Sequence, residues 1–309
     1  MMKVSLDHLP ESKRRDLARV VEILFAEFGE ALARKTAEHR KTGQILKVIL
    51  FGSHARGDWV DDPVGGYVSD YDILVVVNHD ELADVQSYWA KPDDRLTAEV
   101  TIHKRISAPV NFIVHSLHDL NKKLRRGRPF FIDIVRDGIA LYEAQNHPFD
   151  PPQKLSPAEV LREAEGYAEE WLGSADRFKL AAKFLVQNEG PKEAAFQLHQ
   201  ATERLYHGLL LVLTLYSPKS HRLNFLRSQC EQADERLKAA WPRSTRFEQR
   251  CFELLRRAYV DARYSPHYKI TDEELAWLTD RVGALQQLVK QSTDEQLGRL
   301  REAAGLGQA

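Results

Sequence analysis

The apolar positions of the chain change their spacing near residue 150. Before that point, short apolar runs of strand length alternate with amphipathic stretches that follow a helical period. After residue 156, nearly all apolar positions recur with the period of a helix. The pattern predicts an α/β domain over 1–144, a proline-rich linker over 145–155 and an all-α helical bundle over 156–292, with a helical or disordered tail over 293–309.

The predicted first domain contains both helices and strands. An amphipathic helix is expected from Pro10 to about residue 44, and a second over 80–91. Apolar runs predict three buried strands, over 47–51, 71–77 and 109–114. Alternating apolar positions also predict a strand over 95–105. These elements together form an α/β layer.

The second domain is predicted to be entirely helical. Ser156 is a good N-cap and is followed by Pro157, which suits the first turn of a helix. Five helices are expected, over 157–187, 191–215, 220–240, 244–263 and 271–290. The second of them carries a long apolar seam, which predicts pairing with another copy of the chain in a homodimer; its residues are Phe196, Leu205, Leu209 and Val212.

Composition narrows the class of protein but not its activity. The chain has 44 basic and 45 acidic residues, so its net charge of −1 gives no global attraction to nucleic acid. Its two cysteines, Cys230 and Cys251, are far apart and have no metal-ligand spacing, which fits a reducing compartment. The chain begins without a signal-peptide core and has no apolar run of membrane length. We therefore expect a cytoplasmic protein that does not enter a membrane.

The stretch from Lys47 to Asn78 carries the most specific chemistry. A Gly-Ser turn, Gly52-Ser53, follows one apolar strand, and Asp70 and Asp72 come at the start of the next. Side chains alternate along a strand, so the two carboxylates point the same way and form a pair of oxygen ligands suited to Mg²⁺. Gly52 allows close approach of a triphosphate, and Ser53 offers a hydroxyl and amides to its oxygens. These residues together predict nucleotidyl transfer.

This stretch resembles the signature GSxARGxxxxxSDxDLxV of the minimal nucleotidyltransferases in the polymerase-beta-like superfamily. The segment Asp58–Val68 is longer than the usual spacing, which fits a tolerated loop insertion. The resemblance implies Mg²⁺-dependent transfer of a nucleoside monophosphate from ATP or another NTP to a hydroxyl. It also implies that Asp70 and Asp72 are the catalytic metal ligands and that Arg56 joins the Gly-Ser turn in nucleotide binding. The matching residues are Gly52, Ser53, Ala55, Arg56, Gly57, Ser69, Asp70, Asp72 and Val75.

The third carboxylate of that family is missing from its usual place. Members place it at the start of the next strand, whereas this chain has Asn111 there. An amide oxygen can ligate a metal but carries no charge and accepts no proton, so the change could cost about 10² to 10³ in rate. Glu99, on the strand predicted over 95–105, is an alternative source of the missing charge.

The helical domain resembles the HEPN family over most of residues 156–290. The resemblance rests on the segment from Leu198 to Tyr206, with its Gln-Ala-x-Glu core, and on the downstream His221-Arg222-Leu223. HEPN ribonucleases use Arg-x(4 to 6)-His, in which Arg holds the phosphate and His moves the proton. Here only three residues separate Arg263 from His267, so the ribonuclease spacing is absent. Arg263-Tyr264 is closer to the Arg-Tyr-Pro end of HEPN branches thought to bind nucleotides.

The two resemblances imply a fused nucleotidyltransferase–HEPN protein and leave its acceptor open. As an enzyme, the chain would modify a small molecule, RNA or protein, with the HEPN domain forming part of the acceptor site. Tyr268, next to His267 and near Arg263, is one candidate acceptor within the chain itself. The alternatives are a catalytically weak nucleotide- or RNA-binding protein derived from a toxin–antitoxin pair, and a HEPN ribonuclease. A basic cluster at 122–128 is either a solvated helix face or a contact for phosphates.

Overall fold

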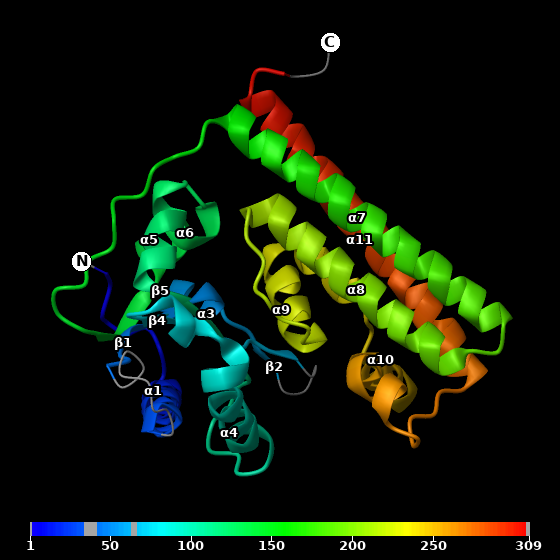
Figure 1. Ribbon diagram of the computed structural model, residues 1–309, viewed down its shortest axis with the longest axis horizontal. Coiled ribbons are helices and arrows are strands. Elements are labelled where there is room, and N and C mark those ends of the chain that lie inside the picture. The colour runs from blue at the N-terminus through cyan, green and yellow to red at the C-terminus, as the bar shows by residue number, and fades with distance from the viewer. Residues whose placement is uncertain (1, 34–41, 63–66, 307–309) are drawn as a thin grey trace. The chain divides into compact units, whose positions relative to one another are not determined.

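The computed structural model describes residues 2–33, 42–62 and 67–306 and divides the chain into two compact units (Figure 1). The first unit, Met1–Lys154, is an α/β fold, and the second, Leu155–Ala309, is helical. The division falls at the end of the predicted linker, where the spacing of the apolar residues changes. The predicted fold class, an α/β unit followed by a helical bundle, is confirmed.

A four-stranded sheet with the order β5-β4-β1-β6 forms the centre of the first unit. β1 pairs antiparallel with β4 and with β6, and β4 pairs parallel with β5. The continuous apolar runs of β1 and β4 are buried along their whole length, as expected for central strands. The strands are β1 (Ile45–Phe51), β4 (Tyr71–Val77), β5 (Val110–Ser116) and β6 (Ile139–Glu143), with a small separate ribbon of β2 (Asp61–Asp62) and β3 (Tyr67–Val68).

Helices cover both faces of the sheet. Side chains from α1 (Glu11–Ala33) and α4 (Ala90–Thr101) share one core with alternate residues of β1, β4 and β5. The residues between these alternates point to the other face. There, Phe51 and His115 make edge-to-face contacts with Phe130 and Phe131 of α6 (Pro129–Asp137), which follows α5 (Leu117–Arg125). Each strand residue therefore belongs to one of two packing layers.

The strand predicted over 95–105 is wrong, because residues 95–101 belong to α4, which ends at Thr101, and residues 102–105 follow the helix. Its buried positions Pro92, Leu96 and Glu99 recur with the helical period, whereas Ile102, which the alternation would have buried, is 72 % exposed. The helix predicted over 80–91 is divided into η1 (Asp80–Ala83) and a π-helical turn, η2 (Val85–Trp89). The expected first helix ends at Ala33, and its predicted continuation over 34–41 lies outside the described residues.

The second unit contains four long α-helices, a shorter one and a 3₁₀ turn within the described residues (Figure 1). Capping boxes at Ser156, Thr245 and Thr271 begin three of the helices. The last helix continues to Ala303, so residues 293–303 of the predicted tail are helical. The elements are α7 (Pro157–Gln187), α8 (Pro191–Thr214), α9 (Leu223–Ala233), η3 (Glu235–Ala240), α10 (Arg246–Tyr264) and α11 (Asp272–Ala303).

The apolar seam of α8 packs inside the unit. Leu205, Leu209 and Val212 are each no more than 1 % exposed, because the neighbouring helices of the same chain cover them. Phe196, the fourth residue of the seam, is partly buried. Three of the four residues are therefore unavailable to a partner, and the homodimer stays a prediction. No helix in the described part of the chain combines the length and the apolar character that crossing a bilayer requires.

Candidate functional site

The Gly-Ser turn connects β1 to the short helix α3 (Gly52–Arg56). Gly52 has φ +72°, a left-handed conformation that glycine adopts without a steric penalty. Gly57 ends the helix, again with positive φ. The Ser53 hydroxyl is buried and has no hydrogen-bond partner among the described residues. A buried hydroxyl without a partner is costly unless a ligand or water completes it.

The two carboxylates and Asn111 meet at the same end of the sheet. β4 and β5 run in parallel with Asp72 paired to Asn111, and Asp70 directly precedes β4, two positions before Asp72. Asn111 Nδ2 donates a 2.7 Å hydrogen bond to Asp70 Oδ2, and Asp72 is fully buried. On the other side of β4, Asp72 lies opposite Phe51, which directly precedes Gly52. The sheet thus gathers the turn, both carboxylates and the amide.

Contacts behind the site fix the start of β4. His54 Nδ1 lies 3.0 Å from the Asp70 carbonyl oxygen, which only accepts, so this nitrogen carries the proton and donates. Burial, helped by the nearby Lys13 charge, lowers the pKa of His54 to about 4, so the ring is neutral at pH 7. The Tyr71 hydroxyl donates to Asp16 Oδ2 at 3.0 Å, and the Tyr71 and His54 ring centroids lie 4.5 Å apart. The sequence carried no signal for this network, because its members meet only in the fold.

Glu99 does not lie with the carboxylates. It is buried in α4 and accepts hydrogen bonds of 3.0 Å from Arg19 in α1 and of 2.7 Å from Arg105. Hydrogen bonds from Arg19, acting against the effect of burial, lower the pKa of Glu99. α1 covers the face that Tyr71 points to, whereas Asp72 points to the other face. Glu99 is therefore a structural ion-pair residue, and of the two candidates for the third position only Asn111 lies beside the carboxylates.

The donor set suits a hard cation. Asp70 and Asp72 offer carboxylate oxygens, and Mg²⁺ is commonly held by one or two carboxylates together with substrate phosphates. Asn111 now presents its NH₂ group to Asp70, so it does not add a third charge. Within the described residues, no group of three or more His, Cys, Asp or Glu side chains is arranged to hold a metal. The residues present therefore fit a metal site of two carboxylates that a nucleotide would complete.

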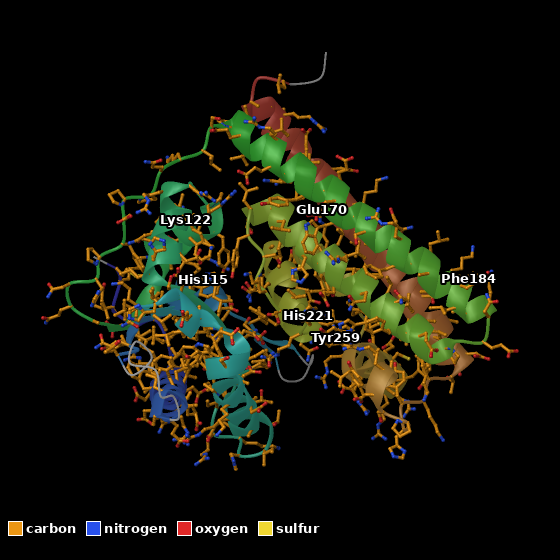
Figure 2. The ribbon with its side chains drawn as sticks, viewed as in Figure 1. His115, Lys122, Glu170, Phe184, His221 and Tyr259 are labelled. Carbon is orange, nitrogen blue, oxygen red and sulfur yellow. The ribbon has the colours of Figure 1, made fainter. Side chains whose placement is uncertain are left out.

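The basic residues predicted to contact phosphate are largely paired. Arg56 is 45 % exposed and lies 3.2 Å from Asp58. Lys123 binds Asp119 and Arg125 binds Asp150, whereas Lys122 extends from α5 at an exposed position (Figure 2). The cluster at 122–128 is thus mainly a helix face with local ion pairs, and Arg56 is the basic residue closest in sequence to the Gly-Ser turn.

The candidate HEPN residues lie around the end of α10. Arg263 is exposed, donates to the Tyr259 carbonyl and lies over the rings of Phe196, Tyr259 and Tyr264. His267 is exposed beyond the end of the helix. Tyr268 is 1 % exposed, and its hydroxyl donates to the Leu254 carbonyl at 3.0 Å. Tyr268 is therefore a core residue, and burial raises the pKa of its hydroxyl. The hydroxyl is unavailable as an acceptor of a nucleotide in this fold.

The sequence reasoning missed a polar cluster centred on Glu203 in α8. Glu203 is 6 % exposed and lies near three histidines: His221 Nδ1 at 2.9 Å, His199 Nε2 at 3.6 Å and His207 Nε2 at 3.8 Å. His221 stacks on Tyr259, with ring centroids 4.8 Å apart (Figure 2). The available signal was the spacing of His199, Glu203 and His207, four residues apart on one helix face.

Comparison with known proteins identifies relatives of both units. A profile of the HEPN domain matches residues 168–292, which lie in the second unit. A protein of Methanocaldococcus jannaschii, named "Putative protein adenylyltransferase MJ0604", is 32% identical to this chain over 102 residues. The matched region covers 32% of this chain and 81% of the relative.

Proposed function

Because this chain belongs to the family of fused nucleotidyltransferase–HEPN proteins, we propose that its first unit transfers AMP from ATP to a hydroxyl group in a Mg²⁺-dependent reaction. The observation that carries this proposal is the meeting of the Gly52-Ser53 turn with Asp70 and Asp72 at one end of the sheet. The name of the archaeal relative supports AMP as the transferred group and a protein hydroxyl as one class of acceptor. A small molecule or RNA remains an alternative acceptor.

Each residue of the turn has a distinct role in this proposal. Gly52 adopts its positive φ without strain and has no Cβ, so it leaves room for a triphosphate beside the backbone. The unpartnered Ser53 hydroxyl donates to a phosphate oxygen, which removes the cost of its burial. Arg56, half exposed, contributes charge toward the phosphates when it leaves Asp58. The turn therefore binds the nucleotide and leaves the carboxylates to hold the metal.

Asp70 and Asp72 are the proposed Mg²⁺ ligands. Bound there, Mg²⁺ would neutralise triphosphate charge and stabilise the charge that develops on the transferred phosphoryl group. His54 keeps the Asp70 backbone in place through its 3.0 Å hydrogen bond, and Tyr71 anchors the same strand through its hydrogen bond to Asp16. Both contacts reduce the motion of the carboxylates, which is what a metal site needs from its surroundings.

A nucleotide-binding protein with weak catalysis is the second candidate, and Asn111 favours it. Its amide accepts no proton and already donates to Asp70, so it supplies neither a base nor a third negative charge. A ribonuclease activity of the helical unit has no such support. The Arg263 guanidinium packs on aromatic rings, and only three residues separate Arg263 from His267, fewer than the HEPN ribonuclease motif has. The contribution of the helical unit to the acceptor site stays a prediction.

Calorimetry with ATP and Mg²⁺ tests the proposal on the full-length protein. We expect ATP binding that depends on the divalent cation, and we expect Asp70→Asn with Asp72→Asn to abolish the metal-dependent part. Glu143→Gln is a matched control, because this carboxylate is also on the sheet but pairs with Lys47. If the double variant binds MgATP as tightly as the parent, the carboxylates are not the metal ligands. Intact-mass measurement of candidate acceptors then separates transfer from binding alone.

A further inference from the structure

The Glu203 cluster holds two buried atoms that face one another without a partner. His199 is fully buried and Glu203 is 6 % exposed, and they lie one turn apart on the same face of α8. Among the described residues, His199 Nε2 and Glu203 Oε2 have no hydrogen-bond partner, although only 3.6 Å separates them. Buried polar atoms of this kind are rare in folded proteins and each one costs free energy.

The protonation of His199 follows from its other nitrogen. Nδ1 lies 3.0 Å from the Leu255 carbonyl of α10, and a carbonyl can only accept, so Nδ1 carries the proton and donates. In the neutral ring, Nε2 then has a lone pair that points toward Glu203. A histidine held by a backbone carbonyl at one nitrogen, with the other nitrogen free, has the arrangement of a metal ligand.

Glu203 is arranged in the same way. Its Oε1 accepts a 2.9 Å hydrogen bond from His221 Nδ1, which orients the carboxylate and leaves Oε2 open toward His199. Because His221 donates to it, the carboxylate acts as an acceptor, and with the neutral His199 ring both atoms of the facing pair are acceptors.

The separation of the pair discriminates between possible occupants. At 3.6 Å, the atoms are too far apart for an ordinary direct hydrogen bond. They are too close for one water to bond both, because a water donating at ordinary lengths joins acceptors roughly 4.4 Å apart. Two ligands on a tetrahedral cation lie roughly 3.4 Å apart, since metal distances to His and carboxylate are about 2.0 to 2.2 Å. The observed separation fits chelation.

We propose that His199 Nε2 and Glu203 Oε2 bind a divalent first-row transition-metal cation such as Zn²⁺. Imidazole combined with carboxylate favours such a cation over Mg²⁺, which prefers oxygen ligands alone. The described residues hold no ready group of three or more His, Cys, Asp or Glu ligands, so solvent completes the coordination and the affinity is moderate. The cation enters beside His221, whose side chain is 60 % exposed.

His207 provides a matched control because it belongs to the cluster but is already satisfied. Its Nε2 donates to the Ser220 carbonyl, and its Nδ1 is bonded to the Ser217 hydroxyl. It lies one turn beyond Glu203 on the same helix and is also buried, so its replacement tests for general damage to the cluster. It has no free lone pair with which to bind a metal.

The experiment is a Zn²⁺ titration followed by calorimetry, with Co²⁺ absorption as a second readout. We use the full-length chain carrying Asp70→Asn and Asp72→Asn, so that the proposed site of the first unit does not contribute. We expect one Zn²⁺ per chain, a Co²⁺ spectrum, and binding at least about tenfold weaker in His199→Gln and in Glu203→Gln. His207→Gln should bind Zn²⁺ as the background protein does.

Four results would overturn the proposal. The first is an absence of Zn²⁺ binding below millimolar concentration in a folded background protein. The second is unchanged binding in both His199→Gln and Glu203→Gln, and the third is an equal loss in His207→Gln. If NMR shows His199 to be an imidazolium at pH 7 and Zn²⁺ does not displace its proton, the pair is an ion pair and not a metal site. None of these results bears on ATP binding by the first unit.

Discussion

The two polar clusters of the protein differ in whether a hydrogen-bond donor lies between two acceptor atoms that face each other. At the end of the sheet, Asn111 Nδ2 donates to Asp70 Oδ2, so an amide hydrogen lies between the two strands. In the helical unit, none of the described residues places a donor between His199 Nε2 and Glu203 Oε2. The Asn111–Asp70 pair is already hydrogen-bonded, whereas the His199–Glu203 pair is completed only by a cation or a proton. The presence or absence of a donor between the facing acceptors thus determines how strongly each cluster requires a ligand.

The two clusters also differ in how the chain assembles them. The sheet-end cluster combines segments separated in sequence, and a multi-residue motif marks it. The helical cluster is built mainly from one helix face, with His221 and the Leu255 carbonyl closing around it. Its chemistry depends on which nitrogen of His199 carries a proton. That assignment requires the fold.

The sharpest way to break the comparison is Asn111→Asp. This change replaces the amide donor with a second acceptor beside Asp70, so that the sheet end acquires an unsatisfied facing pair like that of the helix. We expect the metal-free protein to lose about 3 kcal/mol of stability, from the lost charge-assisted hydrogen bond and the added repulsion. We also expect tighter Mg²⁺ binding and a rise in any transfer rate on the order of 10².

Thermal unfolding with and without Mg²⁺ measures this effect. Asn121→Asp is the control, because Asn121 uses its side-chain oxygen to accept from the Asp150 amide, and aspartate retains that acceptor. Equal Mg²⁺ stabilisation of the parent and of Asn111→Asp would show that Asn111 does not limit the metal site. The same result would remove the main support for weak catalysis.

A second test, the variant Glu99→Gln, distinguishes a carboxylate that stabilises the fold from the carboxylates of the proposed metal site. The variant keeps the shape of the side chain but removes the charge that faces Arg19 and Arg105. Because both arginines are partly exposed, we expect a loss of about 2 kcal/mol in the stability of the first unit. MgATP binding should not change, because Glu99 lies on the other face of the sheet. Hydrogen exchange of the α1 and α4 amides measures the loss.

Glu22→Gln is the control for this variant. Glu22 is 3.9 Å from the same Arg19 but 73 % exposed, so its removal should have little effect on exchange. A folded Glu99→Gln protein with weakened MgATP binding would contradict the assignment of Glu99 to the α1 face. It would reinstate Glu99 as part of the metal site.

The sequence predicted those elements whose local signals agree with their tertiary environment. The strand over 71–77 and the helix over 157–187 are confirmed, the first by its continuous apolar run and the second by its Ser156-Pro157 start. The strand prediction over 95–105 is wrong because the same apolar residues also fit a helix. Which of them are buried depends on packing against α1, which the local sequence does not show. Because this segment was predicted to be a strand, Glu99 was expected beside the carboxylates.

The candidate site was predictable where chemistry and spacing are local. Asp70, Asp72 and the Gly-Ser turn follow from one motif, and the position of Asn111 follows from the order of the strands. The neutral His54 and the Tyr71–Asp16 contact could not be predicted, because both depend on packing between distant segments. Tyr268 shows the converse, since a sequence neighbour of His267 is in the core.

The smallest expected effect tests a cluster in which every charge already has a partner. Asp119 lies 2.7 Å from His115 Nδ1 and 2.6 Å from Lys123 Nζ. The hydrogen bond from His115, with help from Lys123 and against the effect of burial, lowers the pKa of Asp119. A carboxyl group with a lowered pKa stabilises the fold above its unfolded pKa of about 3.9, and that contribution is lost as the pH falls below it.

We therefore expect Asp119→Asn to reduce the stability of the β5–α5 region by about 1 kcal/mol at pH 7, a modest value because the side chain is 35 % exposed. Between pH 4 and 2 the parent should lose this advantage and approach the variant. Hydrogen exchange of the β5 and α5 amides measures both values, with Glu253→Gln as a control, since the Glu253–Arg256 pair is about half exposed. A constant difference across this pH range would show that Asp119 acts through packing, and that a fully paired cluster adds no pH dependence.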